Sequence, residues 1–447
     1  MCTVKPTADP VPTRLGGRIA WIMWAVAASV YVVAVFHRSS LGVAGIEAQE
    51  RFHVSASQLS LFPMLQLLVY AGLQIPVGAL TDRFGAKRVL GCGLVLMTAG
   101  QFAFAFAHGF PGAVLARVLV GMGDAMTFVS VLRVVAVWFP PNRVAVLTQL
   151  TALLGMAGNL AGAGPLAGAL HAFGWSRTFA ASAGVGVVVL VVLLLVLRDN
   201  PGAPVRTRPT GGPGMWSQVR AAWAEPGTRL GLWAHWACGC LPQVFLMLWG
   251  FPFLVEGQGL SKGAASALLT VAIGINMLAC LVVGPLVTRR PGSRLVLCVG
   301  QPVLAAAAWA AVLIPSEPSP MWLLVLLALV IGPGGALSLV GMEFARAGNP
   351  PQRLGTVSGI VNVGGFAAAT LCLFAIGLVL DLVEPGGGEH GLNAYRVAMA
   401  VQAVPLLLGV VQVLRYARKA AGRERRPEPV CVVARSTRER ESVPDAG

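Results

Sequence analysis

Charged residues are scarce in this sequence. Asp, Glu, Lys and Arg make up only 11% of its 447 residues, while apolar residues make up 56%. Because soluble domains usually carry about 25% charged residues, most of the surface of this chain is not expected to face water. The 33 basic residues, of which four are lysine, outnumber 18 acidic residues and leave a net charge of +15. They stand in short segments between long apolar runs, which is typical of membrane orientation and not of a nucleic-acid partner.

Several chemical motifs are also missing. No Gly-x4-Gly-Lys-Ser/Thr loop occurs, so ATP-driven pumping by this chain is not expected. The eight cysteines lack zinc-ligand spacing, and we interpret them as small apolar side chains without a disulfide or a metal. The apolar runs contain neither a His-rich cluster nor a nucleophile beside a base. The sequence therefore predicts no cofactor, no metal site and no enzyme.

Long apolar runs dominate what is present. A helix needs about 20 predominantly apolar residues to cross a bilayer. Twelve such runs occur, with predicted ranges 19–46, 57–80, 88–107, 111–138, 144–170, 175–197, 229–255, 263–288, 294–315, 319–345, 354–382 and 394–415. The first 18 residues are polar and the run after them is long enough to span, so no signal peptide is predicted. The expected fold class is an all-α membrane protein with 12 transmembrane helices.

The twelve runs divide into two groups of six. The predicted parts are a cytoplasmic N-terminal tail, a six-helix bundle, a cytoplasmic linker, a second six-helix bundle and a disordered basic tail, at residues 1–18, 19–197, 198–228, 229–415 and 416–447. With the N-terminus in the cytoplasm, internal segments hold 26 of the 33 basic residues, and the external loops hold Arg51, Arg177, Lys262 and Arg396. This asymmetry predicts that both termini are cytoplasmic.

The two halves share a faint repeat. The segment from Gly78 to Arg88 follows the second run, and the segment from Gly284 to Arg294 follows the eighth, 206 residues later. Each copy begins with glycine and places its arginines alike, although Thr288 stands where the first copy has Asp82. Weak repeats of this kind are expected of transporters that move one bundle against the other.

The first copy has features that membrane orientation does not explain. Gly78 allows two helices to approach closely, and Gly85 allows a tight turn. Asp82 can accept hydrogen bonds from the free N–H groups that open another helix. Gly355 and Thr356, at the start of the eleventh run, could offer such N–H groups.

This segment resembles the signature loop of the major facilitator superfamily, between the second and third helices. The resemblance covers residues 19–415 and implies two six-helix bundles around a central site that opens alternately to each side of the membrane. It also implies cytoplasmic ion pairs that form in one conformation and break in the other, with Glu343 as a partner for the basic loop. The residues of this predicted latch are Gly78, Asp82, Arg83, Gly85, Arg88, Glu343 and Arg346.

The fourth run contains an acid inside the membrane. Its residues Arg117-Val-Leu-Val-Gly-Met-Gly-Asp124-Ala resemble the fourth-helix motif of the same superfamily. An intramembrane carboxylate is costly, which favours a functional role. Arg117 lies on the same helix face, about 10 Å away. We predict proton coupling by Asp124 and Arg117; a structural hydrogen bond and outward snorkelling, respectively, are the alternatives. Arg133 faces the opposite way from Asp124 and is expected to extend toward the cytoplasmic surface, with substrate binding as the alternative.

The first run contains His37-Arg38-Ser-Ser, and the second contains Gln74-Ile-Pro. Together they resemble the organic-anion branches of the superfamily, in which an arginine of the first helix faces the central cavity. The resemblance implies that Arg38 binds an anionic group; helix packing or snorkelling is the alternative. Mid-run amides could line the same pathway, although interhelical hydrogen bonds are their commoner role. The predicted substrate-binding residues are Arg38, Gln66, Gln243, Asn276 and Asn362.

These residues predict a secondary transporter that moves a small organic anion by alternating access with proton coupling. The alternative is a proton-coupled efflux antiporter for drugs or metabolites, because Gly158, Gly162 and Pro165 partly resemble an exporter motif that close helix packing explains as well. A non-transporting sensor is a third possibility. The expected partners are a small-molecule substrate, protons and the lipid bilayer, and the expected state is a monomer. The Arg-, Ala- and Gly-rich composition favours a bacterial inner membrane.

Overall fold

The computed structural model describes residues 15–53, 56–163, 165–200, 214–384 and 391–424, and these residues form helices joined by short connections. Within these described residues, twelve segments are long and apolar enough to cross a membrane, and each overlaps one of the twelve predicted runs. The prediction of an all-α chain with twelve spans is therefore confirmed. The predicted tail at residues 1–18 lies mostly outside the described residues, which begin at residue 15. The first helix begins at Arg18.

The first bundle is built from nine helices of the described chain. They are α1 (Arg18–Val43), α2 (Gly45–Phe52), α3 (Ala56–Phe84), α4 (Ala86–Phe106), α5 (Phe110–Ala125), α6 (Phe128–Trp138), α7 (Pro141–Ala163), α8 (Pro165–Phe173) and α9 (Trp175–Val196). Leu90, Met97 and Leu193 belong to its buried apolar core. The first predicted run extends to 46, whereas α1 ends at Val43 and the short, separate α2 follows.

The second bundle follows a short helix, α10 (Met215–Ala224). Its helices are α11 (Pro226–Val244), α12 (Gly250–Pro252), α13 (Lys262–Arg289), α14 (Ser293–Leu313), α15 (Met321–Ile331), α16 (Gly334–Ser338), α17 (Val340–Ala347), α18 (Leu354–Val383), α19 (Leu392–Ala400) and α20 (Ala403–Glu424). Two π-helical turns, Phe245–Trp249 and Phe253–Gly257, flank α12, and a 3₁₀ turn, Pro351–Arg353, precedes α18. Phe245, Trp309 and Tyr395 belong to the core of this bundle.

Two boundaries differ from the sequence-based expectation. The predicted linker, 198–228, contains α10, whose ten residues are too few for a membrane span and carry polar side chains, so apolar length gives no sign of it. The helix α20 continues to Glu424, nine residues beyond the predicted end of the last span, into the region expected to be disordered. Residues 201–213 of the linker and 425–447 of the tail lie outside the described residues.

Several spans are interrupted where the site is built. The fourth span breaks between α5 and α6, where the Thr127 hydroxyl donates to the Asp124 carbonyl at 2.7 Å. The seventh contains Pro242 and turns π-helical after Val244. Such interruptions re-aim side chains and are frequent at functional sites. Asp124 and Gln243 both stand at one of these breaks.

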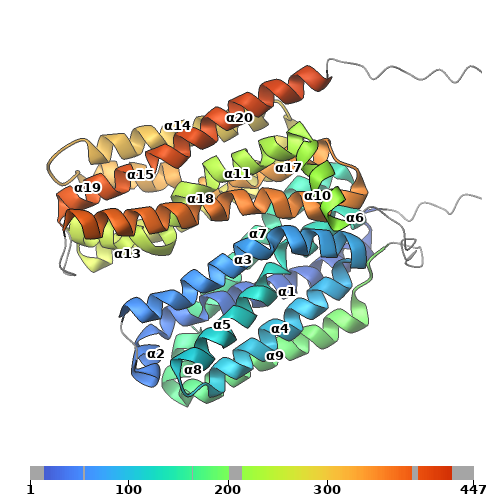
Figure 1. Ribbon diagram of the computed structural model, residues 1–447, viewed down its shortest axis with the longest axis horizontal. Helices are drawn as coiled ribbons and strands as arrows, with labels where there is room; N and C mark the ends of the chain where they lie inside the picture. Colours follow the sequence, from blue (N-terminus) through green and yellow to red (C-terminus); the bar gives the residue numbers. More distant parts are fainter. Residues whose placement is uncertain (1–14, 54–55, 164, 201–213, 385–390, 425–447) are drawn as a thin grey trace, which may run out of the picture.

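The two bundles lie side by side and converge at one end (Figure 1). That end carries α6, α10 and α17, whereas α2 and α19 mark the opposite end, where the bundles diverge (Figure 1). The converging end holds the basic α3–α4 connection, which the distribution of positive charge assigns to the cytoplasm. The structure therefore has its predicted cytoplasmic end closed.

Candidate central cavity and cytoplasmic contacts

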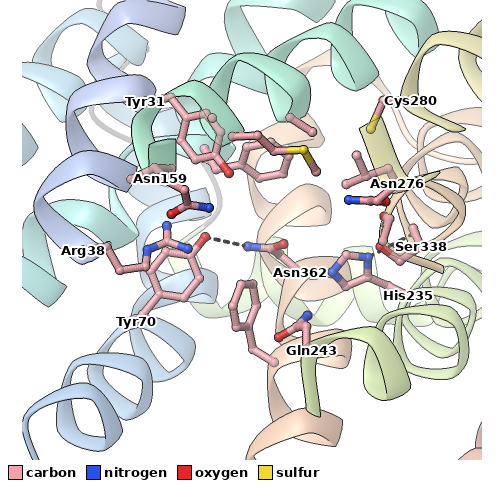
Figure 2. Close-up of a pocket in the computed structure, with 18 residues that line it drawn as sticks. Tyr31, Arg38, Tyr70, Asn159, His235, Gln243, Asn276, Cys280, Ser338 and Asn362 are labelled. Atoms are coloured by element: carbon pink, nitrogen blue, oxygen red, sulfur yellow. Dashed lines mark hydrogen bonds between the residues drawn. The ribbon is translucent and has the colours of Figure 1, made fainter. Parts of the chain in front are cut away.

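A cavity of about 210 Å³ lies between the two bundles. Its lining comes from α1, α3, α6 and α7 on one side and from α11, α13, α16 and α18 on the other (Figure 2). Pockets that bury drug-sized ligands measure roughly 300–1,000 Å³, so this cavity fits a smaller solute. Four of the five predicted substrate-binding residues line it, namely Arg38, Gln243, Asn276 and Asn362.

Arg38 of α1 and Asp124 of α5 form a bidentate ion pair. The Nε and Nη2 atoms of Arg38 donate to the two carboxylate oxygens of Asp124 at 2.7 and 2.8 Å. The Arg38 side chain retains 22% exposure and lines the cavity, whereas Asp124 is only 1% exposed and stands behind it. The Arg38 guanidinium also lies 5.0 Å from the centre of the Tyr70 ring. The positive charge of Arg38, which contacts the cavity, is thus neutralised by the carboxylate of Asp124, which does not.

Asn362 of α18 joins the two bundles at the cavity. Its amide nitrogen donates to the Tyr70 hydroxyl at 3.2 Å and to Gln74 Oε1 at 2.8 Å, both on α3. The ring of Tyr70 also packs against Phe366 of α18, with ring centres 4.6 Å apart. In Figure 2 the Tyr70–Asn362 bond crosses the space between Arg38 and the second bundle. Because these contacts join α3 of the first bundle to α18 of the second, the two bundles can separate at the cavity only if the contacts break.

Two of the predicted site residues lie elsewhere. Arg117 does not contact Asp124: it is fully buried, donates to the His37 carbonyl and the Ser40 hydroxyl, and stacks 4.1 Å from the centre of the Phe104 ring. Both residues of α5 meet α1, Arg117 at His37 and Ser40 and Asp124 at Arg38, so each contacts α1 and not the other.

Gln66 likewise is not among the residues that line the cavity. It is 3% exposed and packs against Gly121, where an added Cβ would lie 3.0 Å from the Gln66 carbonyl oxygen. This mid-span amide of α3 therefore contributes to helix packing, and the expectation that it contacts the pathway does not match its position.

Asp82 connects the two bundles at the cytoplasmic end. Its carboxylate accepts hydrogen bonds from the N–H of Gly355 at 2.9 Å and from the N–H and hydroxyl of Thr356 at 2.7 and 2.8 Å. These are the N–H groups that the sequence suggested, at the beginning of α18. Asp82 also forms an ion pair with Arg133 of α6, which was expected to extend to the surface instead.

Glycines bring the bundles together around this carboxylate. An added Cβ at Gly78 of α3 would overlap the carbonyl oxygen of Gly355 on α18. In the second copy of the repeat, an added Cβ at Gly284 of α13 would lie 2.8 Å from the Cα of Val146 on α7. The two glycines of the repeat thus stand at equivalent contacts between the halves. Only the first of these two contacts has a carboxylate, because Thr288 stands at the position that Asp82 has in the first copy. The Thr288 hydroxyl donates to the Gly284 carbonyl of its own helix.

The other predicted latch residues have different partners from those expected. Glu343 pairs with Arg346 on the same helix, and Arg346 also reaches the Thr148 hydroxyl of α7 at 3.4 Å. The ion pairs expected for Arg83 and Arg88 with loop carboxylates do not occur within the part of the chain that the structure describes.

Gly85 adopts a left-handed φ of +87° at the α3–α4 turn, which agrees with the tight turn predicted there. An added Cβ would lie 2.5 Å from a carboxylate oxygen of Asp199, so the site also has no room for a side chain. Asp199 in turn accepts a hydrogen bond from the N–H of Lys87 at 2.8 Å, near the first turn of α4.

Sequence reasoning missed five polar residues of the cavity: Tyr31, Tyr70, Asn159, His235 and Ser338. Tyr31 stands two helical turns before Arg38, so helical periodicity could have placed it on the same face. His235 lies between Trp233 and Trp236, near the start of the seventh run, where nothing in the sequence indicates a cavity residue. Neither Tyr70 nor Asn159 carries a comparable signal.

The family model of the Major Facilitator Superfamily matches residues 27–372 of this chain. The chain belongs to the major facilitator superfamily. A crystal structure of a bacterial homolog of the human lysosomal transporter Spinster, in an inward-facing and unoccupied conformation, aligns with a TM-score of 0.56 and 18% identity over 93% of this chain and 100% of that chain. At this identity the likeness shows the fold alone. The chain is therefore a multi-pass membrane protein of this superfamily.

Curated relatives carry more specific names. The hexuronate transporter of Bacillus subtilis is 26% identical over 250 residues, 54% of this chain and 58% of the relative. The probable galactarate/D-glucarate transporter GarP of Escherichia coli is 31% identical over 173 residues, 37% and 38% of the two chains. The tetracenomycin C resistance and export protein of Streptomyces glaucescens is 29% identical over 187 residues, 41% and 34%. This chain thus matches between about a third and three fifths of the length of these relatives.

Proposed function

We propose that this transporter carries a small carboxylate together with a proton. The observation that supports the proposal most directly is the Arg38–Asp124 pair. Among the described residues that line the cavity, Arg38 is the only arginine, and there is no lysine, aspartate or glutamate. Its partner Asp124 lies behind it, away from the cavity. A planar guanidinium binds a carboxylate with two parallel hydrogen bonds, so a substrate carboxylate can take the place of the Asp124 carboxylate.

The same pair provides the proton coupling. If a substrate carboxylate occupied Arg38 while Asp124 stayed ionised, Asp124 would be a buried charge without a partner, which is strongly unfavourable. A proton on Asp124 removes that charge and releases Arg38 at the same time. Substrate and proton are therefore bound together, and the pair re-forms when both have left. Arg117, through the His37 carbonyl, fixes the helix turn that carries Arg38 instead of carrying a proton itself.

The relatives named for hexuronate and for galactarate or glucarate support an acidic substrate, since all three are carboxylates. Efflux of drugs or metabolites is supported by relatives named for antibiotic resistance and by the glycines of the fifth span. An added Cβ at Gly158 would lie 3.0 Å from the backbone nitrogen of Phe36, and Gly162 meets the Ser39 side chain. These glycines therefore accommodate α1, which explains them without an exporter motif. A monomeric protein in a bacterial inner membrane completes the proposal.

A flux measurement tests the proposal. Purified protein is reconstituted into liposomes, and uptake of radiolabelled small carboxylates is followed with an imposed pH gradient, an imposed membrane potential or neither. Accumulation of a monovalent carboxylate driven by the pH gradient, and not by the potential, is expected because one proton and one negative charge move together. If only lipophilic cations moved, in exchange for protons, the efflux alternative would replace the proposal.

We also propose that the Asp82 contacts act as the cytoplasmic latch. They join α3 to α18 in the closed state described above and must break when this end opens. Gly78 permits the contact, and Gly85 shapes the connection to α4. Arg346 adds a weaker link between α17 and α7. Arg83, Arg88 and Glu343 belong to the predicted set, and in this closed state their side chains form no ion pair between the bundles among the described residues.

Substitution of Gly78 by alanine is expected to open the cytoplasmic end. The new methyl group overlaps the Gly355 carbonyl, so α3 and α18 must separate. Spin labels at positions 88 and 352, with Cys2, Cys92, Cys280 and Cys431 replaced by serine, should show a longer mean distance by double electron–electron resonance. Gly72 of the same helix has no heavy atom within 4 Å of an added Cβ, so Gly72→Ala is the matched control and should leave the distance unchanged. Equal distances in both variants would contradict the role of Gly78.

A further inference from the structure

The cavity wall opposite Arg38 carries polar side chains but no acidic residue, lysine or arginine among the described lining residues. His235 and Gln243 of α11 and Asn276 of α13 supply three of these polar side chains, and we call these three residues the far wall. In Figure 2 they lie across the cavity from Arg38 and Tyr70. The cavity therefore has a charged side on the first bundle and a hydrogen-bonding side on the second.

His235 offers a hydrogen-bond acceptor that nothing in the described structure uses. Its Nδ1 lies 3.0 Å from the carbonyl oxygen of Ser338. Because a carbonyl oxygen only accepts, Nδ1 must carry the hydrogen, and in the neutral ring the lone pair is on Nε2. The residue is 4% exposed, and Nε2 has no hydrogen-bond partner. Gly365 makes room for this ring edge, since an added Cβ would lie 2.9 Å from Nε2.

The other two residues of the far wall add an acceptor and a donor. Gln243 Oε1 is also buried without a hydrogen-bond partner. Asn276 Oδ1 accepts from the N–H of Ala336 at 2.9 Å, which fixes the amide and leaves its NH₂ group as the donor. The far wall thus has the acceptor of His235 and two amides, each with a carbonyl oxygen and an NH₂ group, and this mixture complements hydroxyl groups, which both donate and accept. A carboxylate, which only accepts, would face the lone pair of His235 Nε2.

We infer that the far wall is a hydroxyl-binding subsite, with His235 Nε2 accepting a hydrogen bond from a substrate hydroxyl, and that the substrate is a hydroxylated monocarboxylate. Its carboxylate binds Arg38 and its hydroxylated end binds the far wall. Dicarboxylates of the same length are disfavoured, because their second carboxylate has no cation to meet. This inference rests on the proposed function, in which Arg38 binds a carboxylate.

Three six-carbon probes test the chemistry of the two ends. Gluconate has one carboxylate and hydroxyl groups, hexanoate has one carboxylate and no hydroxyl, and glucarate has a carboxylate at each end. Binding to the purified full-length transporter is measured by isothermal titration calorimetry. Gluconate should bind at least about 10-fold more tightly than either of the others, the difference that one or two hydrogen bonds provide.

Two variants of His235 separate recognition from structure. In His235→Asn, the amide NH₂ replaces Nδ1 and still donates to Ser338, but the acceptor facing the cavity is lost. In His235→Gln, the longer amide reaches the place of Nε2. The asparagine variant should bind gluconate about 10-fold more weakly and hexanoate as before, and the glutamine variant should recover most of the gluconate affinity.

The outcomes distinguish this inference from the proposed function. If Arg38→Ala abolishes binding of gluconate and hexanoate, but His235→Asn weakens both equally or neither, Arg38 keeps its role and the hydroxyl subsite is overturned. Glucarate binding as tightly as gluconate overturns it as well. If no probe binds, or if binding survives Arg38→Ala, the proposed function itself fails and the subsite fails with it.

Discussion

Substitution of Arg38 by alanine is expected to weaken binding of the carboxylate substrate about 100-fold or more and to abolish uptake. Arg38 supplies the only permanent positive charge in the described lining of the cavity, and its bidentate hydrogen bonds are of the strong, charge-assisted kind. Loss of one partner of a buried pair costs about 3–5 kcal/mol, which corresponds to at least 100-fold in affinity. Equilibrium binding and initial uptake rates in proteoliposomes measure the effect.

Three further variants make this result interpretable. Arg38→Ala leaves Asp124 buried without its partner, so the double variant with Asp124→Asn removes both charges and should fold well while still failing to bind. Arg38→Lys should retain partial affinity, because an ammonium is a single point charge and not a planar fork. Arg18→Ala, at the exposed start of the same helix, should bind like the wild type. Tight binding by the double variant would show that the carboxylate binds elsewhere.

The architecture could be predicted because hydrophobic length is a local property. Each span is a run of about 20 apolar residues that needs no knowledge of its neighbours. The contact of Asp82 with Gly355 and Thr356 was also accessible, since free N–H groups at a helix start attract a carboxylate in any fold. The helix α10 and the end of α20 were missed for the converse reason, because polar helices near a membrane surface carry no long apolar run.

The pairing of charges across helices could not be predicted. On an ideal helix, Arg117 and Asp124 share a face, and Arg133 lies opposite to Asp124. In the structure Asp124 meets Arg38 of α1, and Arg133 of α6 meets Asp82 of α3. Such choices depend on the relative rotation of several packed helices, to which spacing along one helix gives no access. For the same reason Gln66, a mid-span amide like Asn362, packs against a neighbouring helix and not along the cavity.

Substitution of Asp124 by asparagine is expected to separate substrate binding from proton coupling. Asparagine resembles protonated aspartic acid in size and charge, so Arg38 is no longer neutralised and remains available to a substrate carboxylate. Binding should be at least as tight as in the wild type, and exchange of labelled for unlabelled substrate across the liposome membrane should continue. Accumulation driven by a pH gradient should disappear, because no group remains that exchanges a proton when Arg38 changes partner.

The measurement follows from the stoichiometry. With one proton per monovalent anion, a pH difference of one unit should drive about tenfold accumulation in the wild type, since each unit corresponds to about 1.4 kcal/mol. The asparagine variant should equilibrate substrate without accumulating it, and a pH-sensitive dye inside the liposomes should record no proton entry on substrate addition.

Asp82→Asn serves as the control, because the Asp82 carboxylate lies at the cytoplasmic contact and away from Arg38. It should slow transport and leave the tenfold ratio intact, since a latch changes rates and not the proton stoichiometry. Continued tenfold accumulation by the Asp124 variant would move proton coupling to another residue and leave the Arg38–Asp124 pair a structural one.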